Sequence, residues 1–94
     1  MNSFGRGDVV KFSKHAKVRM EKFGAVIFDT LKEDVFTTNE QGAEIIRLLQ
    51  DGKSQSEIIE ELTNEYDENH DEIASDVNNF LRELAEKEIL IGVE

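Results

Sequence analysis

The chain has 94 residues and no cysteine, so its length suits a single domain without disulfides or thiolate metal sites. No apolar run approaches the roughly 20 residues of a transmembrane helix, and we expect a cytoplasmic protein with no membrane partner. The formal net charge is −10, and residues 57–76 hold nine acidic residues and no Lys or Arg, which disfavours binding to the phosphates of duplex DNA.

The first sixteen residues are predicted to form a flexible or extended N-terminal arm. Residues 1–7 are small, polar and rich in glycine. Residues 8–13 (DVVKFS) alternate weakly, which suits either a short strand or an extended segment. The signals for regular structure sharpen after this arm, and we expect one domain over residues 17–94.

Three short β-strands are predicted at the start of this domain. In residues 17–22, Val18 and Met20 alternate with charged side chains, as in a half-buried strand. Residues 25–29 (AVIFD) and 35–38 (VFTT) are rich in β-branched and aromatic side chains. Because the intervening turns are short, the three strands should form an antiparallel meander.

Three helices are predicted to follow, each with a capping signal at its start. Asn39 is a good N-cap, and Ser54 forms a capping box with Glu57 three residues later. Asn69 and Glu72 repeat this spacing before the third helix. The apolar stripe of the third helix consists of Ile73, Val77, Phe80, Leu81 and Leu84.

The order of these elements predicts an α+β fold, with a three-stranded antiparallel sheet followed by three helices. Each helix has one apolar stripe and the sheet has one apolar face, so they should pack around one core. A last apolar stretch, residues 89–91, is expected to pack beneath the sheet.

The sequence offers few candidates for catalysis or metal binding. His15 and His70 have no partner histidine at helical spacing, and no phosphate-binding or nucleophile-elbow motif is present. Residues 67–71 (DENHD) lack the alternating ligands of a calcium loop. We therefore expect a protein that is not an enzyme, with no catalytic residue, no cofactor and no metal.

The third predicted strand, residues 35–38, is the candidate binding element. No later strand is predicted to cover its outer edge, and the free N–H and C=O groups of such an edge can pair with an extended peptide. The alternative is that the N-terminal arm or a second copy of the chain covers this edge.

Four stretches of residues 18–90 resemble the PqqD-like proteins, also called recognition elements for ribosomally synthesised and post-translationally modified peptides. They are VRMEKFGAVIFD, TNEQGAEIIRLLQDG, SEIIEELTNEYD and DVNNFLRELAEKEIL. Members of this family are small winged-helix-like domains that bind the leader of a precursor peptide and present it to a modifying enzyme. The resemblance implies the same fold and a leader-binding function for this chain.

Two details refine the resemblance. Residues 19–24 look similar to the branch associated with radical S-adenosylmethionine enzymes, which implies such an enzyme as a second partner. Thr38 departs from the family pattern, which often has Leu at this position, and leaves the third strand less apolar.

The resemblance also implies a binding site, because the family's leader adds a strand to the third strand and lies in a groove against the third helix. The matching positions are Val35, Phe36, Thr37 and Thr38 in the strand and Asp76, Asn79, Phe80 and Glu83 in the helix. The helical register makes Phe80 either a core residue or the floor of a pocket. Asp76 and Glu83 share one helix face, where they are either solvated or hold a Lys or Arg of the leader.

Two other functions are compatible with the sequence. One is a winged-helix DNA-binding regulator, in which the basic residues 1–22 contact phosphates. The other is a protein–protein adaptor that needs no peptide. The chain is expected to be a monomer or, because of the short linker QDGKS, a domain-swapped dimer.

Overall fold

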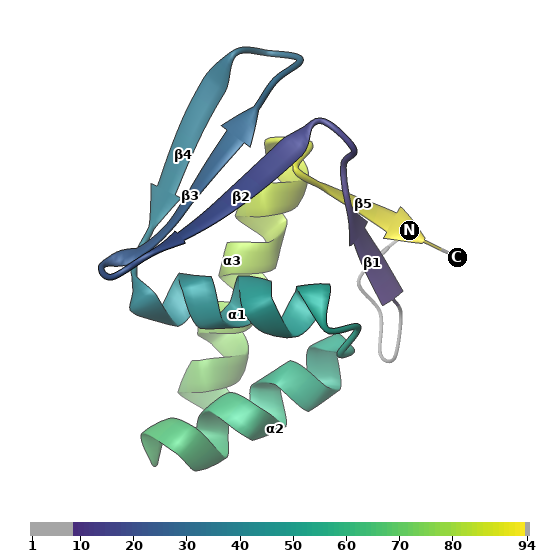
Figure 1. Ribbon diagram of the computed structural model, residues 1–94. Helices are drawn as coiled ribbons and strands as arrows, with labels where there is room; N and C mark the ends of the chain where they lie inside the picture. Colours follow the sequence, from purple (N-terminus) through teal and green to yellow (C-terminus); the bar gives the residue numbers. More distant parts are fainter. Residues whose placement is uncertain (1–8, 94) are drawn as a thin grey trace.

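The computed structural model describes residues 9–93, and Figure 1 shows their arrangement. The predicted α+β fold is confirmed: a three-stranded antiparallel sheet precedes three helices. The elements are β1 (Val9–Phe12), β2 (Ala16–Glu21), β3 (Gly24–Asp29), β4 (Asp34–Thr38), α1 (Glu40–Gln50), α2 (Gln55–Tyr66), α3 (His70–Glu86) and β5 (Leu90–Val93).

The main sheet has the strand order β2-β3-β4, so β3 is central and the other two strands are edges. Ile27 of β3 lies opposite Val18 of β2 and Phe36 of β4. Ile27 is 1% exposed and belongs to the hydrophobic core, and Val18 and Phe36 pack against that core. The helices therefore cover the face of the sheet that carries these three side chains.

Gly24 allows the start of β3 to lie against the end of β4. Its φ is +155°, and a Cβ atom at this position would lie 1.8 Å from the backbone oxygen of Thr38. A side chain does not fit in this space, and L-residues rarely adopt this backbone conformation. Glycine at this position thus permits the close pairing of β3 with the last residue of β4.

A second sheet, formed by β1 and β5, was not predicted. The two strands are antiparallel, with Val9 opposite Val93 and Phe12 opposite Leu90. The part of the predicted arm within the described residues is therefore extended and paired, and residues 1–8 lie outside them. Of the apolar residues 89–91, Ile89 and Leu90 are buried in the core with Ile27, as expected, whereas Ile91 is exposed and the segment also forms a strand beside β1.

The predicted capping residues lie at the helix starts. The Asn39 side chain accepts a hydrogen bond from the Gly42 backbone N–H at 2.9 Å. Ser54 and Glu57 form a complete capping box, and the Asn69 side chain accepts bonds in the first turn of α3. The Asn39 cap fixes where α1 begins, directly after β4.

The core lies between β3, the three helices and the start of β5. Its buried members are Ala25, Ile27, Ile45, Ile46, Leu48, Leu49, Ile58, Leu62, Ile73, Val77, Leu81, Leu84, Ile89 and Leu90. The predicted stripe of α3 is thus confirmed, although Phe80 is only half-buried. No helix in the described part of the chain is long and apolar enough to cross a membrane.

Candidate functional site

The outer edge of β4 has no strand partner within residues 9–93. β5, the strand that follows the helices, pairs with β1 and not with β4. The described part of the N-terminal arm, residues 9–12, is also engaged with β5. The edge predicted to be open is therefore open in this part of the chain.

The register of the sheet determines which β4 groups face this edge. A two-residue turn precedes Gly24, so Gly24 forms a hydrogen-bonded pair with β2. The alternation of an antiparallel ladder then directs the N–H and C=O of Ile27 toward β4, where its partner is Phe36. Val35 and Thr37, on either side of Phe36, consequently direct their N–H and C=O groups outward.

A groove of about 490 Å³ runs between β4, the start of α1 and α3. We call it the acidic groove. It is lined by Phe36, Thr37, Thr38, Asn39, Gln41, Gly42, Ile45, Asp76, Asn79, Phe80 and Glu83. The structure thus brings together all the site residues predicted from the sequence except Val35, which is 61% exposed on the same strand.

Two aromatic rings contribute to the groove from opposite sides. The ring centroids of Phe36 and Phe80 are 6.5 Å apart, with an angle of 31° between the ring planes. Phe80 packs against the core and also lines the groove, so both interpretations of this residue hold. Gly42 lets α1 lie close to the end of β4 and to α3, because a Cβ atom at this position would lie 1.8 Å from Thr38 Oγ1 and 3.1 Å from Phe80 Cζ.

The charge of the acidic groove comes from two carboxylates. Asp76 and Glu83 are both exposed, and neither forms an ion pair with another residue in the described range. No Lys or Arg lines this groove. The groove therefore presents uncompensated negative charge, which attracts a cationic side chain and repels a phosphate backbone.

Four lining residues from α1 and its N-cap were not predicted: Asn39, Gln41, Gly42 and Ile45. The Asn39 cap was itself the available signal, since it starts α1 immediately after β4 and so turns the first helical turn toward the groove. A second pocket, of about 260 Å³, was also missed. It is lined by Ile27, Asp29, Lys32, Asp34, Val35, Phe36, Lys87 and Ile89.

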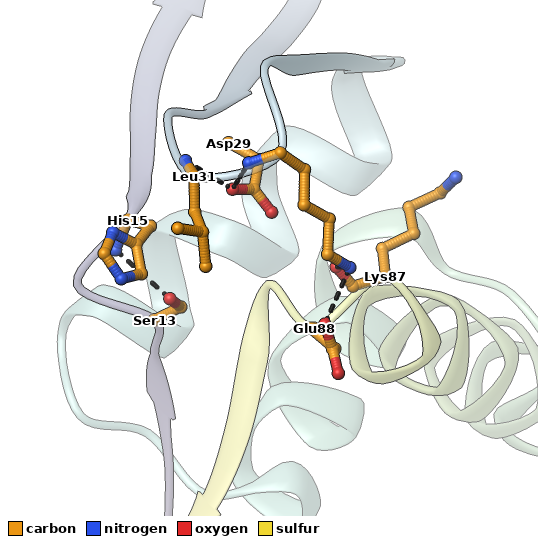
Figure 2. Close-up of polar contacts among 7 residues, drawn as sticks. Ser13, His15, Asp29, Leu31, Lys87 and Glu88 are labelled. Atoms are coloured by element: carbon orange, nitrogen blue, oxygen red, sulfur yellow. Dashed lines mark hydrogen bonds and ion pairs between the residues drawn. The ribbon is translucent and has the colours of Figure 1, made fainter.

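The described residues contain no group of three or more His, Cys, Asp or Glu side chains placed to hold a metal ion. His15 lies in the turn between β1 and β2, where its backbone N–H donates to Ser13 Oγ at 3.1 Å (Figure 2). His70 begins α3, and its Nδ1 lies 3.7 Å from an Asp71 carboxylate oxygen.

Comparisons with known proteins give one family and several similar structures. The family model described as "Coenzyme PQQ synthesis protein D (PqqD)" matches residues 24–90. A search of the curated proteins finds no match. The matched stretch begins at β3 and ends at the first residue of β5.

Three solved structures share the fold. "TbiB1 in Complex with the TbiA(beta) Leader Peptide" is 28% identical, with a TM-score of 0.83 over 89% of this chain and 98% of the other. "Lasso peptide synthetase B1 complexed with the leader peptide" is 22% identical, with a TM-score of 0.82 over 88% and 98%. The PqqD part of Methylobacterium extorquens PqqCD, described as a stand-alone recognition element, is 22% identical, with a TM-score of 0.75 over 94% of each chain.

Proposed function

The chain belongs to the PqqD family, and from this premise we propose that it is a non-catalytic domain that captures the leader of a ribosomally synthesised precursor peptide. The leader adds a strand to the open edge of β4 and lies along the acidic groove beside α3. The observation that carries this proposal is the coincidence of an unpaired edge with a groove lined by the residues expected to bind. The leader-bound state described for TbiB1 supports it.

Each predicted site residue has a role in this proposal. Val35 and Thr37 supply outward backbone groups, which give affinity without reading sequence. Phe36 and Phe80 supply an apolar surface, and Asp76 and Glu83 hold a Lys or Arg of the leader. Thr38 and Asn79 lie beside these groups and offer polar side chains for hydrogen bonds.

We also propose that the domain presents the leader to a radical S-adenosylmethionine enzyme in the cytoplasm. The support is the similarity of residues 19–24 to the branch associated with such enzymes. We propose residues 17–94 as the peptide-binding domain, either monomeric or domain-swapped, and sedimentation analysis at several concentrations distinguishes these two states.

The other two functions are less well supported. The acidic groove has two carboxylates and no lining cation, which disfavours a DNA-binding regulator. A peptide-independent adaptor leaves the open β4 edge without a role. Co-purification with the radical enzyme when no precursor is present is the result that would favour the adaptor.

The test is a titration of the ¹⁵N-labelled chain with the leader of a precursor peptide encoded beside its gene. We expect saturable binding, with the largest shifts at the amides of Val35 and Thr37 and along the groove side of α3. Amides of α2 serve as an internal reference, because α2 contributes no lining residue to the groove. Absence of saturable binding, or shifts that avoid β4 and α3, would contradict the proposal.

A further inference from the structure

The second pocket adjoins the acidic groove at Phe36, whose side chain lines both. Its deepest apolar residues are Ile27 and Ile89, which are 1% and 3% exposed. Both belong to the hydrophobic core, and Phe36 packs against that core. The second pocket is therefore a continuation of the hollow beside β4, with an apolar base that reaches the core.

The charges around the second pocket are compensated from within the chain, unlike those of the acidic groove. The Lys32 Nζ lies 2.8 Å from a Glu88 carboxylate oxygen and donates to the Lys87 backbone oxygen at 3.1 Å, just after the end of α3. The Asp29 carboxylate accepts the backbone N–H groups of Leu31 and Lys32 at 3.0 Å each.

The remaining cation of the second pocket, Lys87, also has a partner. Its Nζ lies 5.0 Å from the centroid of the Phe36 ring, within the range of a cation–π contact. The pocket therefore has two lysines and two aspartates on its rim, whereas the acidic groove has two carboxylates and no cation. The acidic groove therefore favours a cationic side chain. The balanced charges of the second pocket remove that preference, and its base of Ile27, Phe36 and Ile89 offers contacts to an apolar side chain.

Strand geometry relates the two hollows to a bound peptide. In a peptide strand paired with β4, side chains opposite Asp34, Phe36 and Thr38 point to the helix-covered face of the sheet. Thr38 lines the acidic groove and Asp34 lines the second pocket, so a peptide side chain opposite Thr38 would face the groove and one opposite Asp34 would face the pocket. Successive side chains on the inward face of a strand are roughly 6.7 Å apart. Because Asp34 and Thr38 are four residues apart in β4, the peptide residues opposite them are also four residues apart.

We infer that the peptide segment recognised by this chain carries a Lys or Arg and an apolar residue four positions apart. The inference rests on the proposed function and adds the side-chain pattern that the site selects. The order of the two residues follows the strand direction: in an antiparallel strand the cationic residue comes first, and in a parallel strand it comes second.

The experiment uses the full chain and fluorescein-labelled twelve-residue peptides on a Ser/Thr background, measured by fluorescence anisotropy. One pair of peptides has Lys and Leu four positions apart, in the two orders. A third peptide has the better order at a spacing of three, and a fourth replaces Lys by Glu at a spacing of four. We expect the third and fourth peptides to bind about tenfold more weakly than the better of the first two.

A charge-reversal variant separates recognition from folding. Asp76→Lys combined with Glu83→Lys should reverse the preference, so that the Glu peptide binds more tightly than the Lys peptide. Both residues are exposed, so the double variant should fold, which unchanged circular dichroism and urea unfolding verify. Added salt should weaken the Lys preference of the unmodified chain.

The outcomes distinguish this inference from the proposed function. Equal binding at spacings of three and four, with shifts at the β4 amides, would overturn the inference and leave the proposed function standing. An unchanged Lys preference in the charge-reversed variant would overturn it in the same way. Failure of every peptide, including the leader itself, to shift the β4 amides would overturn both.

Discussion

The two edges of the main sheet both present backbone N–H and C=O groups that are unpaired within residues 9–93, but the side chains around the two edges differ. β2 and β4 are both edge strands, and each directs alternate N–H and C=O groups away from β3. β2 carries Lys17, Arg19 and Glu21, and charged side chains of this kind discourage pairing with another strand. β4 has one charged residue, Asp34, and lies beside α3.

The difference identifies what the proposed peptide site has in addition to an open strand edge. No β2 residue lines the acidic groove or the second pocket, whereas β4 contributes to both. In the proposed function, the edge of β4 therefore adds side-chain selection to backbone pairing, whereas the edge of β2 has only backbone groups bordered by charged side chains. Substitutions at β4, at the groove and away from both edges test this difference, each against a matched control.

The largest effect on stability is expected from Gly24→Ala, which disrupts the pairing of β4 with β3. The new Cβ would lie 1.8 Å from the Thr38 backbone oxygen, so the end of β4 must move. We expect a loss of about 3 kcal/mol or more in the free energy of unfolding, measured with urea. Gly52→Ala is the control: its φ is also positive, at +89°, but no atom lies within 4 Å, and about 1 kcal/mol should be lost. Equal losses would contradict the steric explanation.

The next effect tests the two edges directly with proline. Thr37→Pro removes an N–H that faces the open edge, so the fold should survive while leader binding weakens at least tenfold. Met20→Pro removes the corresponding outward N–H of β2 and should leave binding unchanged. Calorimetric titration of both variants with the leader measures this. If both variants weaken leader binding equally, or if neither weakens it, the two edges do not differ in peptide binding.

A smaller effect is expected when the carboxylates of the acidic groove are neutralised. Asp76→Asn and Glu83→Gln should each weaken binding of a cationic leader about two- to fivefold, because each residue is exposed and its ion pair is screened by water. Glu86→Gln, on the same helix but outside the groove lining, is the matched control. Leader affinities at low and moderate salt provide the measurement, and weakening by Glu86→Gln alone would contradict the assignment.

The smallest effect concerns α2, which lies away from both edges. The backbone N–H of Ser54 donates to the Glu57 carboxylate and holds the pKa of that carboxyl below its ordinary value. The stability that this bond contributes is thus present above the ordinary pKa and is lost as pH falls through the lowered pKa. Urea unfolding between pH 6 and pH 3 should show a weaker pH dependence for Glu57→Gln, with leader binding at pH 7 unchanged. A pH dependence identical to that of the unmodified chain would contradict this role.

Local patterns in the sequence predicted most of the fold. The strands of the meander and the caps at Asn39, Ser54 and Asn69 depend on neighbours a few residues away. The pairing of β1 with β5 joins the two ends of the described chain, and no local pattern reports such a partner. The sheet of β1 and β5 was therefore missed.

The site was predicted less completely, for geometric reasons. The family resemblance supplied Phe36, Asp76 and Glu83, which the fold brings to one groove. Which β4 residues face outward depends on the register with β3, which no residue pattern within β4 reveals. The second pocket was missed because it needs Lys32 in a turn to meet Lys87 at the end of a helix, across a long separation in sequence.

The pairing of Val9 with Val93 has a consequence for protein engineering. These two residues, the first and last that the structure describes, lie together in the small β1–β5 sheet, on the side of the molecule away from β4 in Figure 1. Neighbouring ends are the condition under which a domain tolerates circular permutation and insertion into a host protein. A permutant that joins these strands with a short glycine linker and opens the chain at the exposed Gly52 turn keeps the β4 edge and α3 intact. Such a permutant would be inserted into a loop of an enzyme scaffold through the two ends created at the Gly52 turn.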